Sequence, residues 1–403
     1  MSIIVQKYGG SSLASKDKIE KVADNIQRVR SENQKLAVIV SAMGDTTDEL
    51  IDMAHAITED PEPRELDMLL NTGEQISISL LTMALQKRGI PAVSLTGSQL
   101  EVSTTERHQK ARIKDINEQR VMEELDKDKV VVAAGFQGVT EEEEYTTLGR
   151  GGSDTTAVAL AAKLEARCEI YTDVAGIHTC DPGLVSGAKK LSKISYEEMM
   201  EMASLGAEVI HPRAVELASK YEVPIYVGDA FEDKEGTEIG AESEFLEKSV
   251  ITGMAISEDD VQVNLRGVKK RKDLLGKLFS LCGQADINID MISQLLNAED
   301  SMQLSFTVSE NDRKTIAEIM ETYGSDWQMS NWWINESVCK ISVVGPGMRS
   351  QPGVAAEVFN LMQSEDIMIQ MVTTSEIKIS WLVDTEFKAR AAELIAEKFD
   401  LVK

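Results

Sequence analysis

Short apolar runs and longer helical patterns alternate along roughly the first 230 residues of the chain. The runs are mostly apolar throughout, which is typical of strands buried on both faces, and they cover residues 3–6, 36–41, 92–95, 130–133, 169–172 and 225–227. Helical patterns lie between them, notably at residues 16–30, 64–87, 155–165 and 212–220. Because strands that alternate with helices build a mostly parallel sheet, we predict an α/β domain over residues 1–245.

The tail from about Ser249 repeats itself with a constant offset of 80 residues and no gap. The offset brings these pairs into register: Val263 and Val343, Gly267 and Gly347, Phe279 and Phe359, Leu281 and Leu361, Asp286 and Asp366, Ile287 and Ile367, Ile289 and Ile369, Met291 and Met371. An accidental match of two β-α-β cores is the alternative, but a constant offset favours duplication. We predict two small repeats, at residues 249–330 and 337–403, that pair with each other or with a second subunit.

Composition excludes several classes of protein. The formal net charge is −26, so the surface repels nucleic acid and anionic membranes, and any anionic ligand needs a site that gathers cations locally. No apolar run is long enough to span a bilayer, and the N-terminus lacks a secretory pattern. The four cysteines and four histidines are scattered, which predicts neither a metal site nor a disulfide framework and suits the cytoplasm.

Ligand-binding patterns follow the first two predicted strands. KYGGSS at residues 7–12 combines a lysine with glycines that let backbone N–H groups approach a phosphate, although it is not a P-loop. VSAMGDTTD at residues 40–48 places hydroxyl groups at the carboxyl end of a strand, where α/β sheets bind ligands. Each has a plainer explanation: a strand-to-helix turn for the first, and helix capping by Asp45 or Thr46 for the second.

Three further segments carry candidate residues. Glu74, in an NTGEQ segment that interrupts an apolar helix, suits a ligand ammonium group, and an exposed helix carboxylate explains it equally well. TLGRGGSDTT at residues 147–156 is the strongest signal, because three glycines before a helix make an anion site and Arg150 can clamp a carboxylate. Asp154 could be only a helix cap. A strand ending in Thr172-Asp173, followed by Asp181, suits the edge of a nucleotide site.

Together these segments resemble the aspartokinase family of the amino-acid-kinase fold. The matching patterns are K-[FY]-G-G-[ST]-S at residues 7–12, V-S-A-M-G-x-T-T-D at 40–48, T-G-E at 72–74, L-G-R-G-G-S-D at 148–154 and Y-T-D-V-x-G-[IV] at 171–177. The tail resembles the paired ACT repeats of that family, with M-I-x-Q at residues 291–294 and G-M-R-S-x-P-G-V-A at 347–355.

The resemblance implies a three-layer αβα kinase domain and two ferredoxin-like (α+β) ACT domains. It implies that ATP, with Mg²⁺, phosphorylates the β-carboxylate of L-aspartate to 4-phospho-L-aspartate, the first step towards lysine, threonine and methionine. It also implies a homo-oligomer, a dimer or larger, assembled through the ACT domains, and lysine or threonine as an effector. A kinase for glutamate, acetylglutamate or UMP is less favoured, because those enzymes generally lack paired ACT repeats.

The same resemblance assigns roles residue by residue. The catalytic pair is Lys7 and Asp154. The residues implied to bind aspartate are Ser41, Thr47, Glu74, Arg150 and Ser153. Those implied to bind ATP are Lys7, Gly9, Gly10, Ser11, Thr172, Asp173, His178 and Asp181. Those implied to bind the effector are Gln294, Met348, Ser350, Gly353 and Val354.

The chain departs from the family pattern near the nucleotide. Gly183 and Glu208 replace an arginine and a lysine, residues 228–230 replace R-S-S, and His178 replaces an aromatic residue. These changes predict weak ATP binding. A degenerate kinase domain, retained for amino-acid sensing or assembly, is the alternative reading.

The effector loops differ between the two repeats. Residues 269–273 of the first repeat present four cations and no Pro-Gly where the second has RSQPG, and Met368 stands opposite Asn288. A cationic loop repels lysine's ammonium groups, and Met368 cannot hydrogen-bond an effector. We expect inhibition by lysine or threonine to be weak or absent, unless another geometry binds the effector.

Overall fold

The computed structural model describes residues 2–32, 34–207, 209–232, 235–241, 250–270, 273–297, 301–349 and 353–403. The chain forms two compact units. The first comprises Met1–Ile177, Lys190–Ser204 and Glu208–Phe245, and the second comprises His178–Lys189, Leu205–Ala207 and Leu246–Lys403. None of the helices in the described ranges has the length and apolar character that a bilayer crossing requires.

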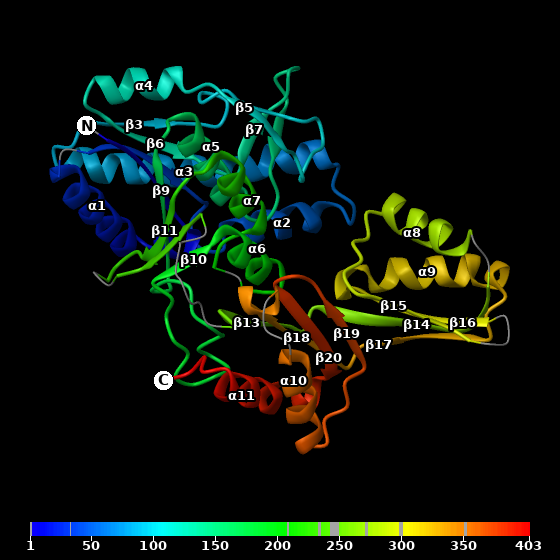
Figure 1. The fold of residues 1–403 in the computed structure, drawn as a ribbon. Helices are drawn as coiled ribbons and strands as arrows, with labels where there is room; N and C mark the ends of the chain where they lie inside the picture. The colour runs from blue at the N-terminus through cyan, green and yellow to red at the C-terminus, as the bar shows by residue number, and fades with distance from the viewer. Residues whose placement is uncertain are drawn as a thin grey trace. The chain divides into compact units, whose positions relative to one another are not determined.

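An eight-stranded sheet forms the centre of the first unit, in the order β10-β12-β11-β9-β1-β2-β6-β3 (Figure 1). Its strands are β1 (Ile3–Tyr8), β2 (Lys35–Val40), β3 (Ala92–Leu95), β6 (Val130–Ala134), β9 (Arg167–Thr172), β10 (Lys193–Ser195), β11 (Ile225–Asp229) and β12 (Thr237–Gly240). All neighbours run parallel except β11 and β12. The mostly parallel sheet predicted from the apolar runs is therefore confirmed.

Five helices of the first unit pack on this sheet: α1 (Lys16–Ser31), α3 (Pro63–Lys87), α4 (Gln119–Asp126), α5 (Gly152–Lys163) and α6 (Tyr196–Ser204). Two others pack on helices, α2 (Thr46–Ile57) on α3 and α7 (Pro212–Tyr221) on α5 and α6. One core joins Tyr8, Val38 and Val132 to the apolar residues of α1 and α3. Successive strand residues point to opposite faces, so Lys7 points away from this core. Helix α5 packs on β1, β2 and β9.

A smaller sheet in the first unit has the order β5-β4-β7-β8. Its strands are β4 (Val102–Thr104), β5 (Ile113–Ile116), β7 (Gln137–Val139) and β8 (Tyr145–Thr147). β8 ends immediately before the Gly-rich segment that opens α5. The β4–β5 hairpin carries residues 105–112 in its loop.

The second unit contains both repeats, each with a four-stranded antiparallel sheet and two helices (Figure 1). The first repeat comprises β14 (Asp260–Lys269), α8 (Leu274–Gln284), β15 (Ile292–Leu296), β16 (Ser301–Ser309), α9 (Arg313–Tyr323) and β17 (Asn331–Asn335). The second comprises β18 (Val338–Val344), α10 (Val354–Ser364), β19 (Met371–Thr374), β20 (Lys378–Asp384) and α11 (Lys388–Lys398). The repeat extends to backbone detail, since Asp286 and Asp366 have φ of 60° and 57°.

Two segments join the second repeat from earlier in the chain. Strand β13 (Gly253–Ser257) pairs with β18. Residues 178–189 of the predicted 1–245 domain also pack there, since Cys180 and Val185 enter the core of the second repeat and Thr179 Oγ1 donates to Leu401 O at 2.5 Å. The second unit therefore includes residues 178–189, which a linear division of the sequence keeps in the first domain.

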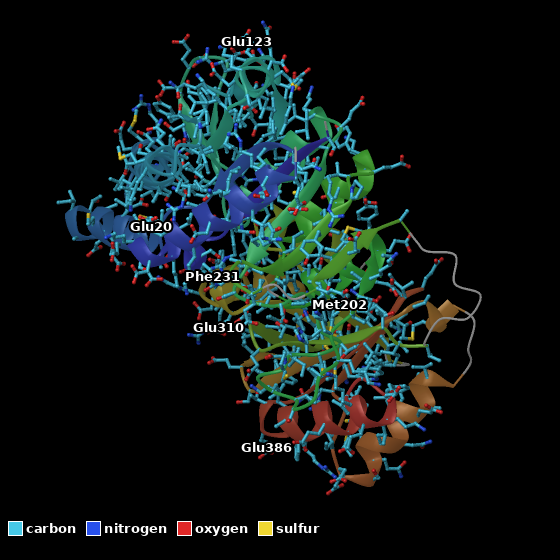
Figure 2. The ribbon with its side chains drawn as sticks, turned by 90° about the vertical axis from the view of Figure 1, so that its left-hand side faces the viewer. Glu20, Glu123, Met202, Phe231, Glu310 and Glu386 are labelled. Atoms are coloured by element: carbon cyan, nitrogen blue, oxygen red, sulfur yellow. The ribbon has the colours of Figure 1, made fainter. Side chains whose placement is uncertain are left out.

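Acidic side chains lie on the surface of both units. Glu123 of the first unit and Glu310 and Glu386 of the second are exposed (Figure 2). These acidic side chains are kept in water, and a site for an anion needs its own local cations.

Candidate active site

Lys7 and Asp154 form an ion pair at the carboxyl end of β1. Lys7 Nζ lies 2.5 Å from Asp154 Oδ1, and the two residues are only 9% and 7% exposed. The contact follows from the fold, because Lys7 points to the face of β1 on which α5 packs and Asp154 lies in the first turn of α5. Asp154 Oδ2 also accepts the backbone N–H of His211 at 3.3 Å.

The first Gly-rich loop packs directly on the loop after β2. Gly44 N–H donates to Gly10 O at 2.9 Å, and a Cβ at Gly10 would lie 2.7 Å from Ala42 O. Only glycine permits this approach of two backbones. Gly9 N–H donates to Tyr171 O at 3.3 Å, and Ser11 O accepts from Lys18 Nζ at 2.7 Å. The loop is therefore held on both sides, beside Lys7.

Two hydroxyl groups meet where β2 and α5 approach each other. Ser41 Oγ lies 2.7 Å from Ser153 Oγ, so the predicted substrate residues of two distant motifs are neighbours. Thr47 stands in the first turn of α2, after the same loop. The capping explanation for this loop is wrong: Asp45 is the N-cap but makes no side-chain capping bond, and Thr46 Oγ1 donates backwards to Met43 O.

Glu74 is buried, not exposed, on the inner face of α3. It is 2% exposed, and its oxygens accept from Ala42 N–H at 3.1 Å and from Gln137 Nε2 at 3.4 Å. Both donors are neutral, and burial raises the pKa of Glu74 to about 7. An ammonium group of a ligand would supply the opposite charge that favours the ionised carboxylate.

Arg150 is exposed and lies between two glycines in the left-handed region, Gly149 with φ 75° and Gly151 with φ 69°. A Cβ at Gly151 would lie 2.1 Å from the His211 ring, so glycine lets the imidazole pack on the loop. Burial lowers the pKa of His211, which the charge of Asp154 opposes and the charges of Arg213 and Arg150 reinforce. Gly152 N–H donates to Gly149 O at 3.0 Å, so this loop closes onto the start of α5.

Three positions missed by the sequence analysis hold this region together. His211 and Arg213 come from the start of α7, where Arg213 donates to Leu148 O at 2.7 Å and to Ala111 O at 3.1 Å. Their signal in the sequence is a His-Pro-Arg triplet at a helix start. Asp67 of α3 is fully buried and accepts from Thr147 Oγ1 at 2.6 Å. A lone Asp in a helix pattern gives no comparable signal.

The predicted nucleotide residues divide between the two units. Thr172 and Asp173 follow β9, the neighbour of β1 in the sheet, and Thr172 Oγ1 donates to Asp173 Oδ1 at 3.0 Å. His178 and Asp181 belong to the second unit, where Asp181 Oδ1 accepts Gly183 N–H at 2.8 Å. Glu208 lies outside the described residues.

The predicted effector residues belong to the two repeats. Gln294 lies on β15 and donates to Met302 Sδ at 3.2 Å. Met348 packs against the core of the second repeat, and Gly353, with φ 111°, is the N-cap of α10, which Val354 begins. Ser350 lies outside the described residues.

Comparison with known proteins identifies both parts of the chain. The amino acid kinase family model matches residues 2–229, and an ACT domain model matches residues 341–399. Aspartokinase 2 of Bacillus subtilis is 45% identical over 404 residues, which are 100% of this chain and 99% of that protein. The aspartokinase of Corynebacterium glutamicum is 42% identical and covers 100% of this chain and 97% of its own length.

Solved structures agree with the sequence relatives. The aspartate kinase from Synechocystis has 38% identity and a TM-score of 0.56, and covers 100% of this chain and 70% of that one. E. coli aspartokinase III, solved with aspartate and ADP, has a TM-score of 0.83 at 24% identity. The match covers 99% of this chain and 100% of that one. At that identity the likeness shows the fold alone. The match to the kinase model over more than half the chain, together with full-length relatives above 40% identity, shows that this chain belongs to the aspartokinase family.

Proposed function

We propose that this chain transfers the γ-phosphoryl group of ATP to the β-carboxylate of L-aspartate, giving 4-phospho-L-aspartate and ADP. The observation that carries the proposal is the Lys7–Asp154 pair, held at 2.5 Å between two Gly-rich loops and close to the motifs of Ser41 and Arg150. An intact pair at this position argues against a degenerate domain. The full-length relatives are named as aspartokinases and aspartate kinases.

The charges of the site suit aspartate. Arg150 would bind the α-carboxylate as a bidentate clamp, and Glu74 would accept from the ammonium group. The hydroxyl groups of Ser41, Thr47 and Ser153 would complete the pocket. The β-carboxylate is already ionised near neutral pH, so its oxygen attacks the γ-phosphorus without a general base, and the bond from that phosphorus to ADP breaks.

Stabilisation of charge is the main catalytic requirement, because an anion attacks an anion. Lys7 would offset the negative charge on the transferring group, and Asp154 would orient the ammonium. The N–H groups of Gly10 and Ser11 would face the phosphates, Gly9 would allow their close approach, and Thr172 and Asp173 would contact the nucleotide. The roles of His178 and Asp181 stay predictions of the family resemblance.

The side chains fit Mg²⁺ that arrives bound to the nucleotide. In the described part of the chain, no three His, Cys, Asp or Glu side chains gather as metal ligands. Mg²⁺ is commonly held by substrate phosphates with one or two carboxylates, and Asp173, which directly follows β9, would supply one such carboxylate. When bound, the ion neutralises phosphate charge.

We propose that the tail chiefly assembles the chain into a homo-oligomer, and that lysine or threonine, the effectors implied by the family resemblance, inhibits weakly or not at all. Strand β15 is the edge of its sheet, and it exposes Ile292, Leu295 and Leu296 at 52%, 58% and 61%. An apolar edge strand offers unpaired backbone groups to another chain. We place the protein in the cytoplasm, because its four cysteines are buried and unpaired.

One assay tests the activity. The purified chain is given ATP and Mg²⁺ with aspartate, glutamate, acetylglutamate or UMP in turn, and ADP release is measured. We expect release with aspartate well above the other three. ADP release with only one of the other acceptors would identify that acceptor as the substrate. Release with none of the four would favour the hypothesis of a degenerate kinase domain.

A further inference from the structure

Three of the buried polar residues of helix α3 lie in a row on one face. Asp67, Asn71 and Glu74 occupy positions i, i+4 and i+7, which lie above one another on a helix. They are 0%, 1% and 2% exposed. Glu74 is the group proposed to receive the substrate ammonium, so this row leads from the substrate site along the inner face of the helix.

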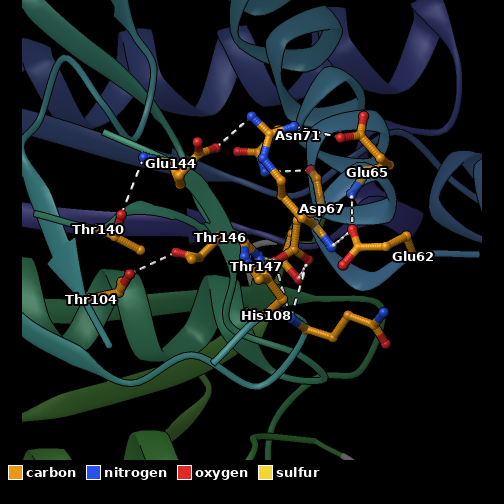
Figure 3. Close-up of polar contacts among 12 residues, drawn as sticks. Glu62, Glu65, Asp67, Asn71, Thr104, His108, Thr140, Glu144, Thr146 and Thr147 are labelled. Atoms are coloured by element: carbon orange, nitrogen blue, oxygen red, sulfur yellow. Dashed lines mark hydrogen bonds and ion pairs between the residues drawn. The ribbon is translucent and has the colours of Figure 1, made fainter. Parts of the chain in front are cut away.

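Asp67 accepts hydrogen bonds from two segments other than its own helix (Figure 3). From the β4–β5 loop, His108 Nδ1 lies 2.8 Å from Oδ2, and Gln109 N–H donates to both oxygens at 3.2 and 3.1 Å. From the end of β8, Thr147 Oγ1 donates to Oδ1 at 2.6 Å. A buried carboxylate costs free energy unless it is well hydrogen-bonded, so these contacts fix both segments firmly to α3.

Both segments converge on the residue before Arg150. Thr147 precedes Gly149 by two residues, and a Cβ at Gly149 would lie 2.7 Å from Gln109 O, so the β4–β5 loop rests on the glycine backbone. Ala111 N–H donates to Thr147 O at 3.0 Å, which ties the two segments to each other. Asp67 therefore anchors the segment that carries Arg150 to helix α3.

We propose that Asp67 is a positioning residue that holds the Arg150 loop in place relative to Glu74, and thereby fixes where the α-carbon of the amino-acid substrate lies. The inference rests on the proposed function, in which those two groups hold the ammonium and the α-carboxylate. Because the ammonium and the α-carboxylate are both attached to the α-carbon, holding them fixes the α-carbon, and the length of the side chain then decides whether its carboxylate meets the transferring phosphate. Glutamate, one methylene longer, would bring its carboxylate too far. A single methylene is typically discriminated by about 10–200-fold.

The test replaces Asp67 by the isosteric amide. Asp67→Asn turns one acceptor into an N–H₂ group that faces N–H and O–H donors, so the two segments lose their anchor. We expect the KM for aspartate to rise about tenfold and the KM for ATP to change less than about twofold. The aspartate-to-glutamate ratio of kcat/KM should fall by about tenfold. Thr147→Val removes one of the three donor residues and should shift the same quantities less.

A matched control separates positioning from stability. Glu124 of α4 is also buried, at 2% exposed, and its carboxylate pairs with Lys127 and Lys129 at 3.0 and 2.7 Å. Glu124→Gln should lower the melting temperature without changing the ratio between the two substrates. A folded Asp67→Asn chain with the wild-type ratio and KM for aspartate would overturn the proposal. If Asp67→Asn does not fold, the same two quantities are measured in Thr147→Val, and wild-type values of both would overturn the proposal.

Amide hydrogen exchange gives a readout independent of turnover. Exchange at residues 148–151 should be faster in Asp67→Asn and unchanged in Glu124→Gln. Unchanged exchange in Asp67→Asn would overturn the positioning role even in a chain that phosphorylates aspartate. Conversely, a wild-type chain that turns over no aspartate would refute the proposed function, while faster exchange in Asp67→Asn would still support the anchor.

Discussion

Lys7 at the end of β1 and Asp154 in the first turn of α5 are 147 positions apart in the sequence, yet their charged atoms lie 2.5 Å apart in a nearly buried pair. The backbone N–H of His211 holds the second oxygen of Asp154. The carboxylate is therefore fixed by a strand and a helix start, and it fixes the ammonium in turn. A pair so constrained can present its cation to a phosphoryl group without rearranging.

Removal of the cation should abolish turnover. Lys7→Ala deletes the group proposed to offset charge in the transition state, so we expect kcat to fall by about a thousandfold or more. ADP release in the presence of aspartate measures the loss, and circular dichroism checks that the fold is kept. Near-normal turnover in the folded variant would contradict the assignment of Lys7.

Loss of the carboxylate clamp should act on one substrate only. Arg150→Ala removes the exposed guanidinium between Gly149 and Gly151, so the KM for aspartate should rise far more than the KM for ATP. Initial rates measured against each substrate give both constants. Equal increases in the KM for aspartate and the KM for ATP would indicate that Arg150 binds the nucleotide instead.

Glu74 should give aspartate binding a distinctive pH dependence. Burial raises the pKa of Glu74 to about 7, and only the ionised carboxylate can pair with the substrate ammonium. The KM for aspartate should therefore rise about tenfold per pH unit below pH 7 and level off above it. Glu74→Gln should bind aspartate weakly at every pH and lose this slope. A slope that survives the substitution would assign the titration to another group.

The same shift has a consequence for stability with the opposite sign. A carboxylate with a folded pKa of about 7 against an unfolded value of 4.5 stabilises the ligand-free fold fully below pH 4.5. That contribution to the free energy of unfolding, about 3 kcal/mol, is lost as the pH rises from 4.5 to about 7. Denaturant titrations of the wild type and Glu74→Gln should therefore diverge across this window.

The two repeats are joined by a charge pair at equivalent positions. Lys340 and Asp260 are separated by the repeat offset of 80, and Lys340 Nζ lies 2.9 Å from Asp260 and 2.6 Å from Asp290. Burial alone would lower the pKa of Lys340, but the two carboxylates outweigh it and hold the pKa above its usual value. Identical residues at both positions would repel each other, so the opposite charges favour pairing of unlike repeats.

Removing only the cation of this cluster should lower the stability of the fold more than removing all three of its charges. Lys340→Met leaves two carboxylates without their cation, which typically costs about 3–5 kcal/mol. The triple variant Lys340→Met, Asp260→Asn, Asp290→Asn leaves no charge behind and should be more stable than the single variant. Thermal unfolding of the full chain ranks the two. A single variant as stable as the wild type would mean that the cluster contributes little.

The sequence predicted the elements better than their contacts. Continuous apolar runs and helical patterns predicted six strands and four helices of the first unit close to the observed bounds, because those signals are local. Helix α5 begins at Gly152, three residues before its predicted start, because glycines weaken a helical pattern even where the chain turns helical. The placement of β13 and residues 178–189 in the second repeat depends on tertiary pairing alone, so no local pattern reports it.

The site residues show the same difference between local signals in the sequence and contacts made only by folding. Motif residues such as Ser41 and Ser153 were found because glycines and hydroxyl groups gather around them in the sequence. Asp67 was missed because its partners lie 41 and 80 positions away, and only the packing of α3 against β8 brings them together. The sequence also left Glu74 undecided between exposed and buried, since the helix is apolar on more than one face.

The last prediction concerns feedback control. Lys270 of the first repeat donates to Asn297 O at 2.6 Å, so part of its cationic loop is fixed to the end of β15. Arg271, Lys272 and Ser350 lie outside the described residues. In the second repeat Met368 is 72% exposed at the position equivalent to Asn288, so an apolar side chain stands in water where an amide would contact an effector. Both features predict weak or absent inhibition by lysine and threonine.

Initial rates at saturating aspartate and ATP, with lysine, threonine or both up to about ten times the substrate concentration, should stay within about twofold of the uninhibited rate. Met368→Asn restores an amide at the exposed position and should increase any inhibition without changing the uninhibited rate, because Met368 belongs to the second unit and Lys7 belongs to the first. Strong inhibition of the wild type by sub-millimolar lysine or threonine would contradict the prediction. Calorimetric binding of either amino acid to the full chain without a change in rate would instead assign the tail a ligand that does not regulate turnover.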